Sequence, residues 1–551
     1  MLKRFVSLLL AAVMLLSLVG CTDTATEKPL AEVSFLDQIE TGSVTVPETD
    51  YVDTAVEKPL TVESVLALIN TDRLEEMSYV PESIMEISQS HEYDNLLSHE
   101  ECQMLLEEKY PTGDVTKEQA IEDAEYLWKA FASAYGGYYY FGDDTFKNAH
   151  QQMINDINAY EGDGISYDTF DDIASRAYGF IKDRHIRFFQ DIRYAVYYVR
   201  GLFIREDMNG FYTLISGQKW YLRKVDKGSI NDYIHITIAD TGELMYGFYC
   251  RFASDTDNSM PKTLTVERGS ETMELSLTWK KSGAIGWDQA NTFGRFYATE
   301  NIDGHNVVKI RSFGYFLNDG YAEELEKYME TGNFLSGQDY VIIDSRSNGG
   351  GSNGCPSVWM NRFLGNSAAD MDNNFRDRLE SSKVTFFVRS RLYEYASKQR
   401  YPDFIISENQ TEYPRERIIT YAEQTKNEHP MFVLTDYMSG SAGEAIITQY
   451  RTVENVLIIG TNTDGCMFGS VELYIQLPNT GYNVGFAQGV SLEDFVNREG
   501  YGYDPDIWVP SEYALELTLQ MCEFYGLSDP DAQPLPTYGE VPERVDLSGY
   551  R

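Results

Sequence analysis

Histidine is scarce in this chain, and lysine is absent from its C-terminal part. It has only seven histidines in 551 residues, and none follows His429. No lysine follows Lys426. A catalytic site built by the C-terminal part of the chain must therefore take any imidazole from upstream, and it cannot use a lysine from that part.

Positive charge is scarce in general. The chain has 45 lysines and arginines against 86 aspartates and glutamates, which gives a formal net charge of −41. Nucleic acid and anionic lipid surfaces repel such a chain, so we expect neither as a partner. Hydrophobic residues make up 43% and aromatic residues 13% of the sequence, which is typical of a chain that buries cores. The length is that of about three domains.

Metal and cofactor motifs are also missing. The six cysteines show no CxxC spacing and no histidine-rich stretch accompanies them, so we predict neither a zinc motif nor a disulfide framework, although a single disulfide is an alternative. The phosphate-loop pattern G-x-x-x-x-G-K-[ST] does not occur. We expect no cofactor.

Long apolar runs are absent except at the N-terminus. Lys3 and Arg4 precede an apolar run over 5–19, and Cys21 follows shortly after it. A basic start, a short apolar stretch and a small residue before the cut are typical of a secretory signal and not of a membrane span. The tetrad Leu-Val-Gly-Cys that ends at Cys21 resembles a bacterial lipobox.

The lipobox resemblance implies cleavage before Cys21 and a diacylglycerol on its sulfur. We therefore predict a lipoprotein signal peptide over 1–20 and a lipid anchor on the extracytoplasmic face of a bacterial membrane. The polar residues 21–61 are predicted to form a flexible tether. They contain a short repeat, because DTATEKPL at 23–30 recurs as DTAVEKPL at 53–60.

The remainder divides into four segments by pattern. Residues 62–189 show helical periodicity, and 190–285 show the alternation and turn signals of a small β-rich module. Strands and helices alternate over 286–528, which favours a layered α/β domain. Residues 529–551 are rich in proline and glycine and are predicted to form an extended tail. The last two β runs of 190–285 resemble the closing strands of a PDZ-type domain, with a plain β insert as the alternative.

One turn in the α/β segment has the form that a nucleophilic serine needs. A buried apolar strand over 430–434 leads to a predicted helix over 442–450, and Ser439-Gly440-Ser441 lies between them. A turn of small residues from strand to helix exposes a side chain and directs backbone N–H groups and the helix dipole at a bound group. A nucleophile needs this exposure, and the oxyanion it forms needs such donors. The alternative is that Ser441 only caps the helix.

A second turn of small residues, Gly349-Gly350-Gly351, follows the buried strand 340–344. Glycine permits close backbone approach, so this turn could point N–H groups at an anion. Taken alone, it could equally be a tight turn without a ligand.

The two turns, in this order, resemble the C-terminal processing (tail-specific) serine peptidase family. There, an Asp-Leu-Arg-x-Asn-x-Gly-Gly turn supplies an oxyanion donor and a Ser-Ala-x-Glu turn supplies the nucleophile. The resemblance covers about residues 300–510 and implies a crotonase/ClpP-like α/β peptidase core. It also implies Ser441 as nucleophile and the N–H groups of Gly350 and Ala442 as oxyanion hole. The matching residues are Asp344, Arg346, Asn348, Gly350, Gly351, Ser441, Ala442 and Glu444, with Ser345 in the leucine position.

The base distinguishes two branches of this family. Many members activate the serine with a lysine just past a Thr-x-Gly turn, where this chain has Cys466. The branch that includes the tricorn core protease uses Ser-His-Glu, with the histidine in an Asp-x-His-Thr-like segment before the β insert. Asp183-Arg184-His185-Ile186 occupies that place, and Glu499 stands shortly before the Pro-Asp motif. The resemblance thus implies His185 as base and Glu499 as its orienting acid. A surface histidine and, for Cys466, a small core residue are the alternatives.

These inferences predict a membrane-tethered serine endopeptidase that cleaves polypeptides through an acyl-enzyme, without a metal or nucleotide. Because His185 precedes the β insert and Ser441 follows it, we expect the site at a domain interface, completed when the helical region closes onto the core. The departures at Ser345, Ile186 and Cys466 leave an alternative: an inactive peptidase-like lipoprotein that binds peptides or envelope proteins. A carbohydrate-binding or solute-binding lipoprotein is a weaker one.

Overall fold

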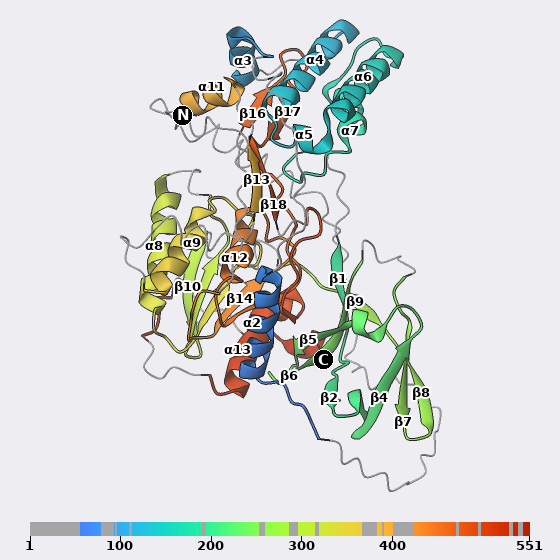
Figure 1. Ribbon diagram of the computed structural model, residues 1–551, viewed down its shortest axis with the longest axis vertical. Coiled ribbons are helices and arrows are strands. Elements are labelled where there is room, and N and C mark those ends of the chain that lie inside the picture. Colours follow the sequence, from blue (N-terminus) through green and yellow to red (C-terminus); the bar gives the residue numbers. More distant parts are fainter. Residues whose placement is uncertain are drawn as a thin grey trace.

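The computed structural model describes residues 56–78, 93, 96–108, 113–186, 188, 194–252, 259–285, 296–314, 319–365, 383–387, 391–400, 424–469, 473–493, 498–527, 533–537 and 544–550. The predicted signal peptide, Cys21 and most of the tether lie outside these residues. Figure 1 shows a helical region, a central α/β core and a β-rich module. The α/β fold class is confirmed.

A six-stranded sheet forms the centre of the core, in the order β10-β11-β12-β14-β15-β19. The hairpin β10–β11 is antiparallel, and all following pairs are parallel. The strands are β10 (Tyr297–Ile302), β11 (His305–Ile310), β12 (Val341–Asp344), β14 (Met431–Thr435), β15 (Val456–Gly460) and β19 (Ile507–Trp508). The parallel strands are continuous apolar runs because both faces of the sheet are covered.

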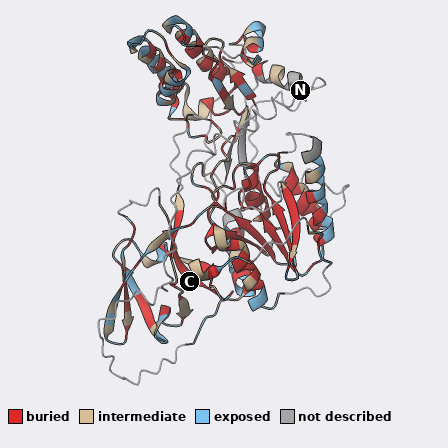
Figure 2. Ribbon diagram, turned by 180° about the vertical axis from the view of Figure 1, so that it is seen from behind, coloured by how far each residue is buried: buried red, intermediate tan, exposed pale blue. Residues whose placement is uncertain are grey.

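Side chains alternate strictly between the two faces. In β14, Met431 and Val433 pack in one core while Phe432 and Leu434 pack in the other. The first face is covered by α8 (Asp319–Leu335), α9 (Gly354–Phe363) and α12 (Ala442–Tyr450), and the second by α2 (Val62–Ser78) and α13 (Ala514–Phe524). Figure 2 shows the resulting buried sheet.

The position of α2 corrects the predicted domain boundaries. We expected 62–189 to form one helical domain, but Val62 and Val65 are buried against the core sheet. Arg73 also donates to the Val456 carbonyl and pairs with Asp506. Helical periodicity predicts a helix with an apolar stripe, but it does not state which sheet or helix that stripe meets.

The helical region contains α3 (His99–Leu106), α4 (Lys117–Ala134), α5 (Tyr138–Phe141), α6 (Asp143–Ala159) and α7 (Tyr167–Tyr178). The capping box predicted for Thr116 and Gln119 is present. Later parts of the chain complete this region, because Leu392, Leu473 and Val484 share its core. These belong to α11 (Arg391–Arg400), β16 (Leu473–Gln476) and β17 (Asn483–Phe486). We had assigned them to the α/β core, and that assignment is wrong.

A two-stranded ribbon, β13 (Lys383–Phe387) with β18 (Gly489–Glu493), runs between the helical region and the core in Figure 1. Buried Asp123 on α4 accepts hydrogen bonds from the β16–β17 turn, at Thr480 N and Oγ1, both 2.6 Å away. The helical region and the C-terminal half of the chain are thus interleaved.

The β-rich module consists of two antiparallel sheets, β5-β6-β1-β9 and β2-β3-β4-β7-β8. Its strands are β1 (Ala195–Val199), β2 (Arg205–Asp207), β3 (Gly210–Ile215), β4 (Gln218–Val225), β5 (Ile234–Ile238), β6 (Leu244–Phe252), β7 (Thr263–Arg268), β8 (Glu271–Ser276) and β9 (Trp279–Lys281). The alternation predicted over 190–285 thus corresponds to strands in the structure.

Both ends of the described chain pack on the folded body. In the predicted tether, Glu57 forms a β-bridge with Asp207 and accepts from the Tyr212 hydroxyl at 2.5 Å. In the predicted tail, Leu535 and Tyr550 are buried, and Tyr550 donates to the Ile238 carbonyl. The described parts of both segments are therefore anchored. Among the described residues, no helix is long and apolar enough to cross a membrane.

Candidate active site

The turn that carries Ser441 is strained. Ser441 has φ 52° and ψ −127°, a backbone region that non-glycine residues rarely adopt and that costs free energy. Hydrogen bonds from Gly443 N to the Gly440 carbonyl and from Glu444 N to the Ser441 carbonyl, both 2.8 Å, hold the turn. The Ser441 side chain makes no capping hydrogen bond to α12, so the helix-cap alternative is wrong.

The Ser441 hydroxyl instead meets His185. His185 Nε2 lies 3.1 Å from Ser441 Oγ, although the two residues are 256 positions apart. Ser441 comes from the core, and His185 comes from the turn that follows α7 of the helical region. The predicted pair is thus brought together at the interface between these two parts.

Asp183 binds the backbone of His185 and lies near its imidazole. The backbone N–H of His185 donates to Asp183 Oδ1 at 3.0 Å. This is a common local turn, in which an aspartate side chain accepts from the backbone N–H two residues further on. The same oxygen lies 3.6 Å from His185 Nδ1. Asp183 is fully buried, and its other oxygen accepts from the Tyr135 hydroxyl at 3.0 Å. A proton on Nδ1 facing this carboxylate leaves Nε2 free to accept the serine proton.

Neighbouring residues fix the turn on both sides of His185. Ile186, which replaces the threonine of the family pattern, is buried in the helical core. Arg184 pairs with Asp464 at 2.9 Å. His185 is therefore not an ordinary surface histidine.

Glu499 is at the site, but it binds backbone N–H groups. Its Oε1 accepts from Arg184 N at 2.6 Å, and its Oε2 accepts from Met467 N at 2.9 Å and Phe468 N at 2.8 Å. Burial, together with the nearby charge of Asp183, raises the pKa of Glu499 to about 8. Glu499 thus ties the His185 turn to the Cys466 loop, while Asp183 is the carboxylate that lies near the imidazole, 3.6 Å from Nδ1.

Cys466 lies against the imidazole. Its Sγ is 3.4 Å from His185 Nδ1 and 3.5 Å from Nε2. The prediction that it is merely a small core residue is wrong. Burial raises the pKa of the Cys466 thiol well above its usual range, so the sulfur carries a proton at neutral pH. A protonated thiol is a poor nucleophile.

Glu444, in the first turn of α12, positions Cys466. It is fully buried and accepts from Thr463 Oγ1 at 2.5 Å, Gly465 N at 3.0 Å and Cys466 N at 2.7 Å. Burial raises the pKa of Glu444 to about 8. The glutamate of the Ser-Ala-x-Glu turn therefore holds the next loop beside the serine.

Gly350 lies on the other side of the serine. A Cβ at this position would come within 2.8 Å of Ser441 Cβ and 2.9 Å of Ala442 N, and φ is +101°, so only glycine fits. The Gly350 N–H donates to Asn348 Oδ1 at 3.0 Å. The N–H of Ala442 has no acceptor among the described residues. Of the two predicted oxyanion donors, Ala442 is thus unengaged and Gly350 is held by its own loop.

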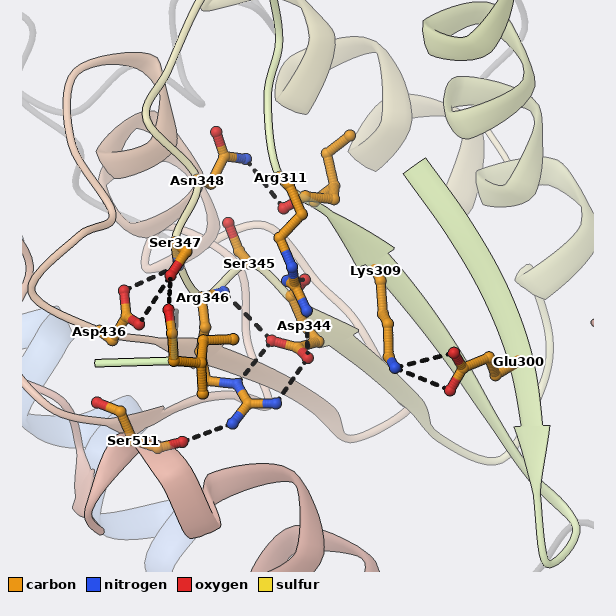
Figure 3. Close-up of polar contacts among 12 residues, drawn as sticks. Glu300, Lys309, Arg311, Asp344, Ser345, Arg346, Ser347, Asn348, Asp436 and Ser511 are labelled. Carbon is orange, nitrogen blue, oxygen red and sulfur yellow. Dashed lines mark hydrogen bonds and ion pairs between the residues drawn. The ribbon is translucent and has the colours of Figure 1, made fainter. Parts of the chain in front are cut away.

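Buried charges anchor the glycine loop, as Figure 3 shows. Asp344, at the end of β12, pairs with Arg346 and Arg311, both at 2.8 Å. These two guanidinium groups hold the pKa of Asp344 well below its usual range despite burial. Further along the loop, Ser347 N donates to Asp436 Oδ1 at 2.8 Å.

Sequence reasoning did not assign roles to Asp183, Glu444 and Cys466. The spacing Asp-x-His was a signal for Asp183, since an aspartate commonly binds the backbone N–H two residues on. No comparable signal placed Cys466 beside His185, because their contact joins segments 281 residues apart.

The chain was compared with known proteins. Residues 306–509 match the model of Peptidase family S41. No curated protein matches the sequence. Similar solved structures include mature CPAF (14% identity, 74% of this chain and 96% of that chain, TM-score 0.37) and the photosystem II D1 C-terminal processing protease (15%, 76% and 99%, 0.32). The tricorn protease also matches (12%, 75% and 36%, TM-score 0.30).

The family match contains Ser441, Ala442 and Gly350, and the strained serine turn lies within it, between β14 and α12. Residues 306–509 of this chain are therefore a Peptidase family S41 domain.

Proposed function

We propose that this protein is a lipid-anchored serine endopeptidase that cleaves polypeptides on the extracytoplasmic face of a bacterial membrane. The observation that carries the catalytic part is the 3.1 Å contact between His185 Nε2 and Ser441 Oγ. This distance is within the range in which a base can take the proton of a nucleophile.

The first half of the reaction forms an acyl-enzyme. His185 Nε2 takes the proton from Ser441 Oγ as the oxygen attacks the peptide carbonyl. Asp183, 3.6 Å from Nδ1, stabilises the imidazolium that results. His185 then gives the proton to the leaving amine, and the C–N bond breaks.

The oxyanion is stabilised from the backbone. The Ala442 N–H at the start of α12 and the helix dipole point toward the serine turn. The Gly350 N–H becomes the second donor once it exchanges Asn348 Oδ1 for the oxyanion. In the second half, His185 activates a water that hydrolyses the ester.

The anchor rests on the sequence of the N-terminus. Cys21 ends the lipobox-like tetrad, and residues 21–55 provide the link to the folded body. Mass spectrometry of protein extracted from membranes tests it. A diacylglycerol on Cys21 is expected, and a Cys21→Ser variant with an unchanged membrane fraction would contradict the anchor.

Labelling with a fluorophosphonate tests the catalytic proposal. Wild type should label, and Ser441→Ala and His185→Ala should not. His429→Ala, which removes a histidine outside the site, is the control and should label like wild type. If the wild type did not label, the proposal that this protein is a serine peptidase would be overturned.

The engaged Gly350 N–H favours a second candidate, the inactive peptidase-like lipoprotein that binds peptides or envelope proteins. Under that candidate, peptides bind without turnover and wild type does not label. Labelling that depends on Ser441 excludes it.

A further inference from the structure

Three potential metal ligands of different kinds converge at the active site. One ligand atom each from His185, Cys466 and Glu499 lies within 4.8 Å of the other two. The residues come from three separate segments: the turn after α7, the loop after β15 and the loop before β19. Each is only partly buried, so the cluster is accessible from solvent.

We propose that His185, Cys466 and Glu499 bind a thiophilic divalent cation, with zinc as the best fit, and that this metal reversibly inhibits the peptidase. The inhibitory part rests on the function proposed above. The binding part does not, because it depends only on the ligand geometry.

The spacing suits zinc. With Zn–S and Zn–N bonds of about 2.3 and 2.0 Å, two ligands of a tetrahedral site are about 3.5 Å apart. Cys466 Sγ lies 3.4 Å and 3.5 Å from the two imidazole nitrogens. Thiolate, imidazole and carboxylate together are ligands that zinc prefers, and three of them leave a fourth position for water.

The carboxylate can still bind a metal although it accepts hydrogen bonds. At least three backbone N–H groups donate to Glu499, and a bound metal would share its carboxylate oxygens with these donors. The same hydrogen bonds hold its oxygens in place, as outer-sphere contacts commonly do for metal ligands. Binding replaces the proton of the Cys466 thiol by the metal, and that proton goes to solvent.

Inhibition follows from the chemistry of the imidazole. A metal on Nε2 occupies the lone pair that must accept the Ser441 proton. A metal on Nδ1 forces the proton of the neutral ring onto Nε2, which then cannot accept one. In either mode, His185 can no longer act as the base. Because Cys466, which stands in the lysine position of the related enzymes, is one of the proposed ligands, this residue makes the site responsive to metal.

Binding is tested on the metal-free folded protein with Co²⁺ as a spectroscopic probe. Wild type should bind one Co²⁺ with a near-ultraviolet thiolate-to-cobalt band, which added Zn²⁺ abolishes. Cys466→Ala should lack the band, and Glu499→Gln should weaken binding by about 100-fold. Cys250→Ser, a buried cysteine of the β-rich module, is the matched control and should keep the band. A missing band in wild type, or a band that survives Cys466→Ala, overturns the site.

Inhibition is tested by fluorophosphonate labelling with and without a slight excess of Zn²⁺. The ratio of the two rates should fall by about tenfold or more in wild type and stay near one in Cys466→Ala. Equal ratios in both proteins overturn the inhibitory role. A wild type that never labels overturns the proposed function and with it the inhibition, whereas the cobalt spectrum still decides the site.

Discussion

Ser441 lies between the glycine loop on one side and the His185 and Cys466 loops on the other, and the buried carboxylates on these two sides have pKa values shifted in opposite directions. On the oxyanion side, Asp344 is buried between Arg311 and Arg346, which hold its pKa well below the usual range. On the base side, Glu444 and Glu499 accept backbone N–H groups, and burial raises the pKa of each to about 8. One side is thus fixed by ion pairs that persist at any working pH, while the other changes its protonation near neutrality. In the proposed reaction, the transferred proton belongs to the second side.

The largest effect is expected where the two sides meet. His185→Ala should lower the rate of acyl transfer by roughly 10⁴-fold to 10⁶-fold, because a serine without its base keeps only binding and oxyanion stabilisation. The rate of turnover of a peptide substrate measures it, and the urea midpoint should stay near that of wild type. A variant that keeps a tenth of the rate would assign the base elsewhere.

Breaking the ion-paired side should affect stability most. Asp344→Asn leaves two buried guanidinium groups without their carboxylate, and removal of one partner from such a pair costs about 3–5 kcal/mol. Urea unfolding followed by circular dichroism measures it. Glu323→Gln removes a carboxylate from an exposed pair on α8 and should leave the midpoint unchanged. Equal midpoints for both variants would refute the anchoring role of Asp344.

Glu499 tests the base side. Glu499→Gln places an amide NH₂ against backbone N–H donors, and an unsatisfied buried donor costs about 1–3 kcal/mol. Because Glu499 positions His185 and Cys466, kcat should fall by roughly tenfold to a hundredfold with KM nearly unchanged. A change confined to KM would instead point to a role in substrate binding.

The smallest expected effect is a pH dependence of stability that differs between the two sides of Ser441. The folded pKa of Glu444 is raised from 4.5 to about 8, so its protonated form is favoured in the fold. Its stabilising contribution is complete below about pH 4.5 and is lost as the pH rises to about 8, by at most about 1.4 kcal/mol per pH unit. The unfolding free energy of wild type relative to Glu444→Gln should therefore fall over this range.

Asp344 has the opposite sign and serves as the comparison. Its pKa is lowered, so its contribution is present at neutral pH and is lost only as the pH falls below the ordinary value of 3.8. The difference in unfolding free energy between wild type and Asp344→Asn should be constant from pH 5 to 8. If the unfolding free-energy difference between wild type and Glu444→Gln varied with pH in the same way as that between wild type and Asp344→Asn, the contrast between the two sides would be refuted.

Much of the site could be predicted from local sequence. The strand, the turn of small residues and α12 place Ser441, and glycine at 350 follows from the close approach to the serine. The absence of a later lysine restricted the base, and the resemblance to a known family selected His185. The prediction of the serine turn succeeds because strand, turn and helix signals act over a few residues.

What depends on distant contacts could not be predicted. Periodicity over 62–78 indicates a helix, yet α2 covers the core sheet instead of joining the helical region, because its apolar stripe fits either partner. The same holds for β16 and β17, whose buried residues share the hydrophobic core of the helical region. Sequence spacing also suggested that Glu499 faces the imidazole, whereas it binds the backbone of Arg184, Met467 and Phe468.

The sequence by itself determined the serine turn, the exclusion of a lysine base and the layered α/β core. Only the tertiary structure decided that Asp183 lies near the imidazole, that Glu444 and Glu499 hold the loops around it, and that Cys466 touches it. The physical reason is that burial and distance set these roles, and both arise when segments hundreds of residues apart pack together.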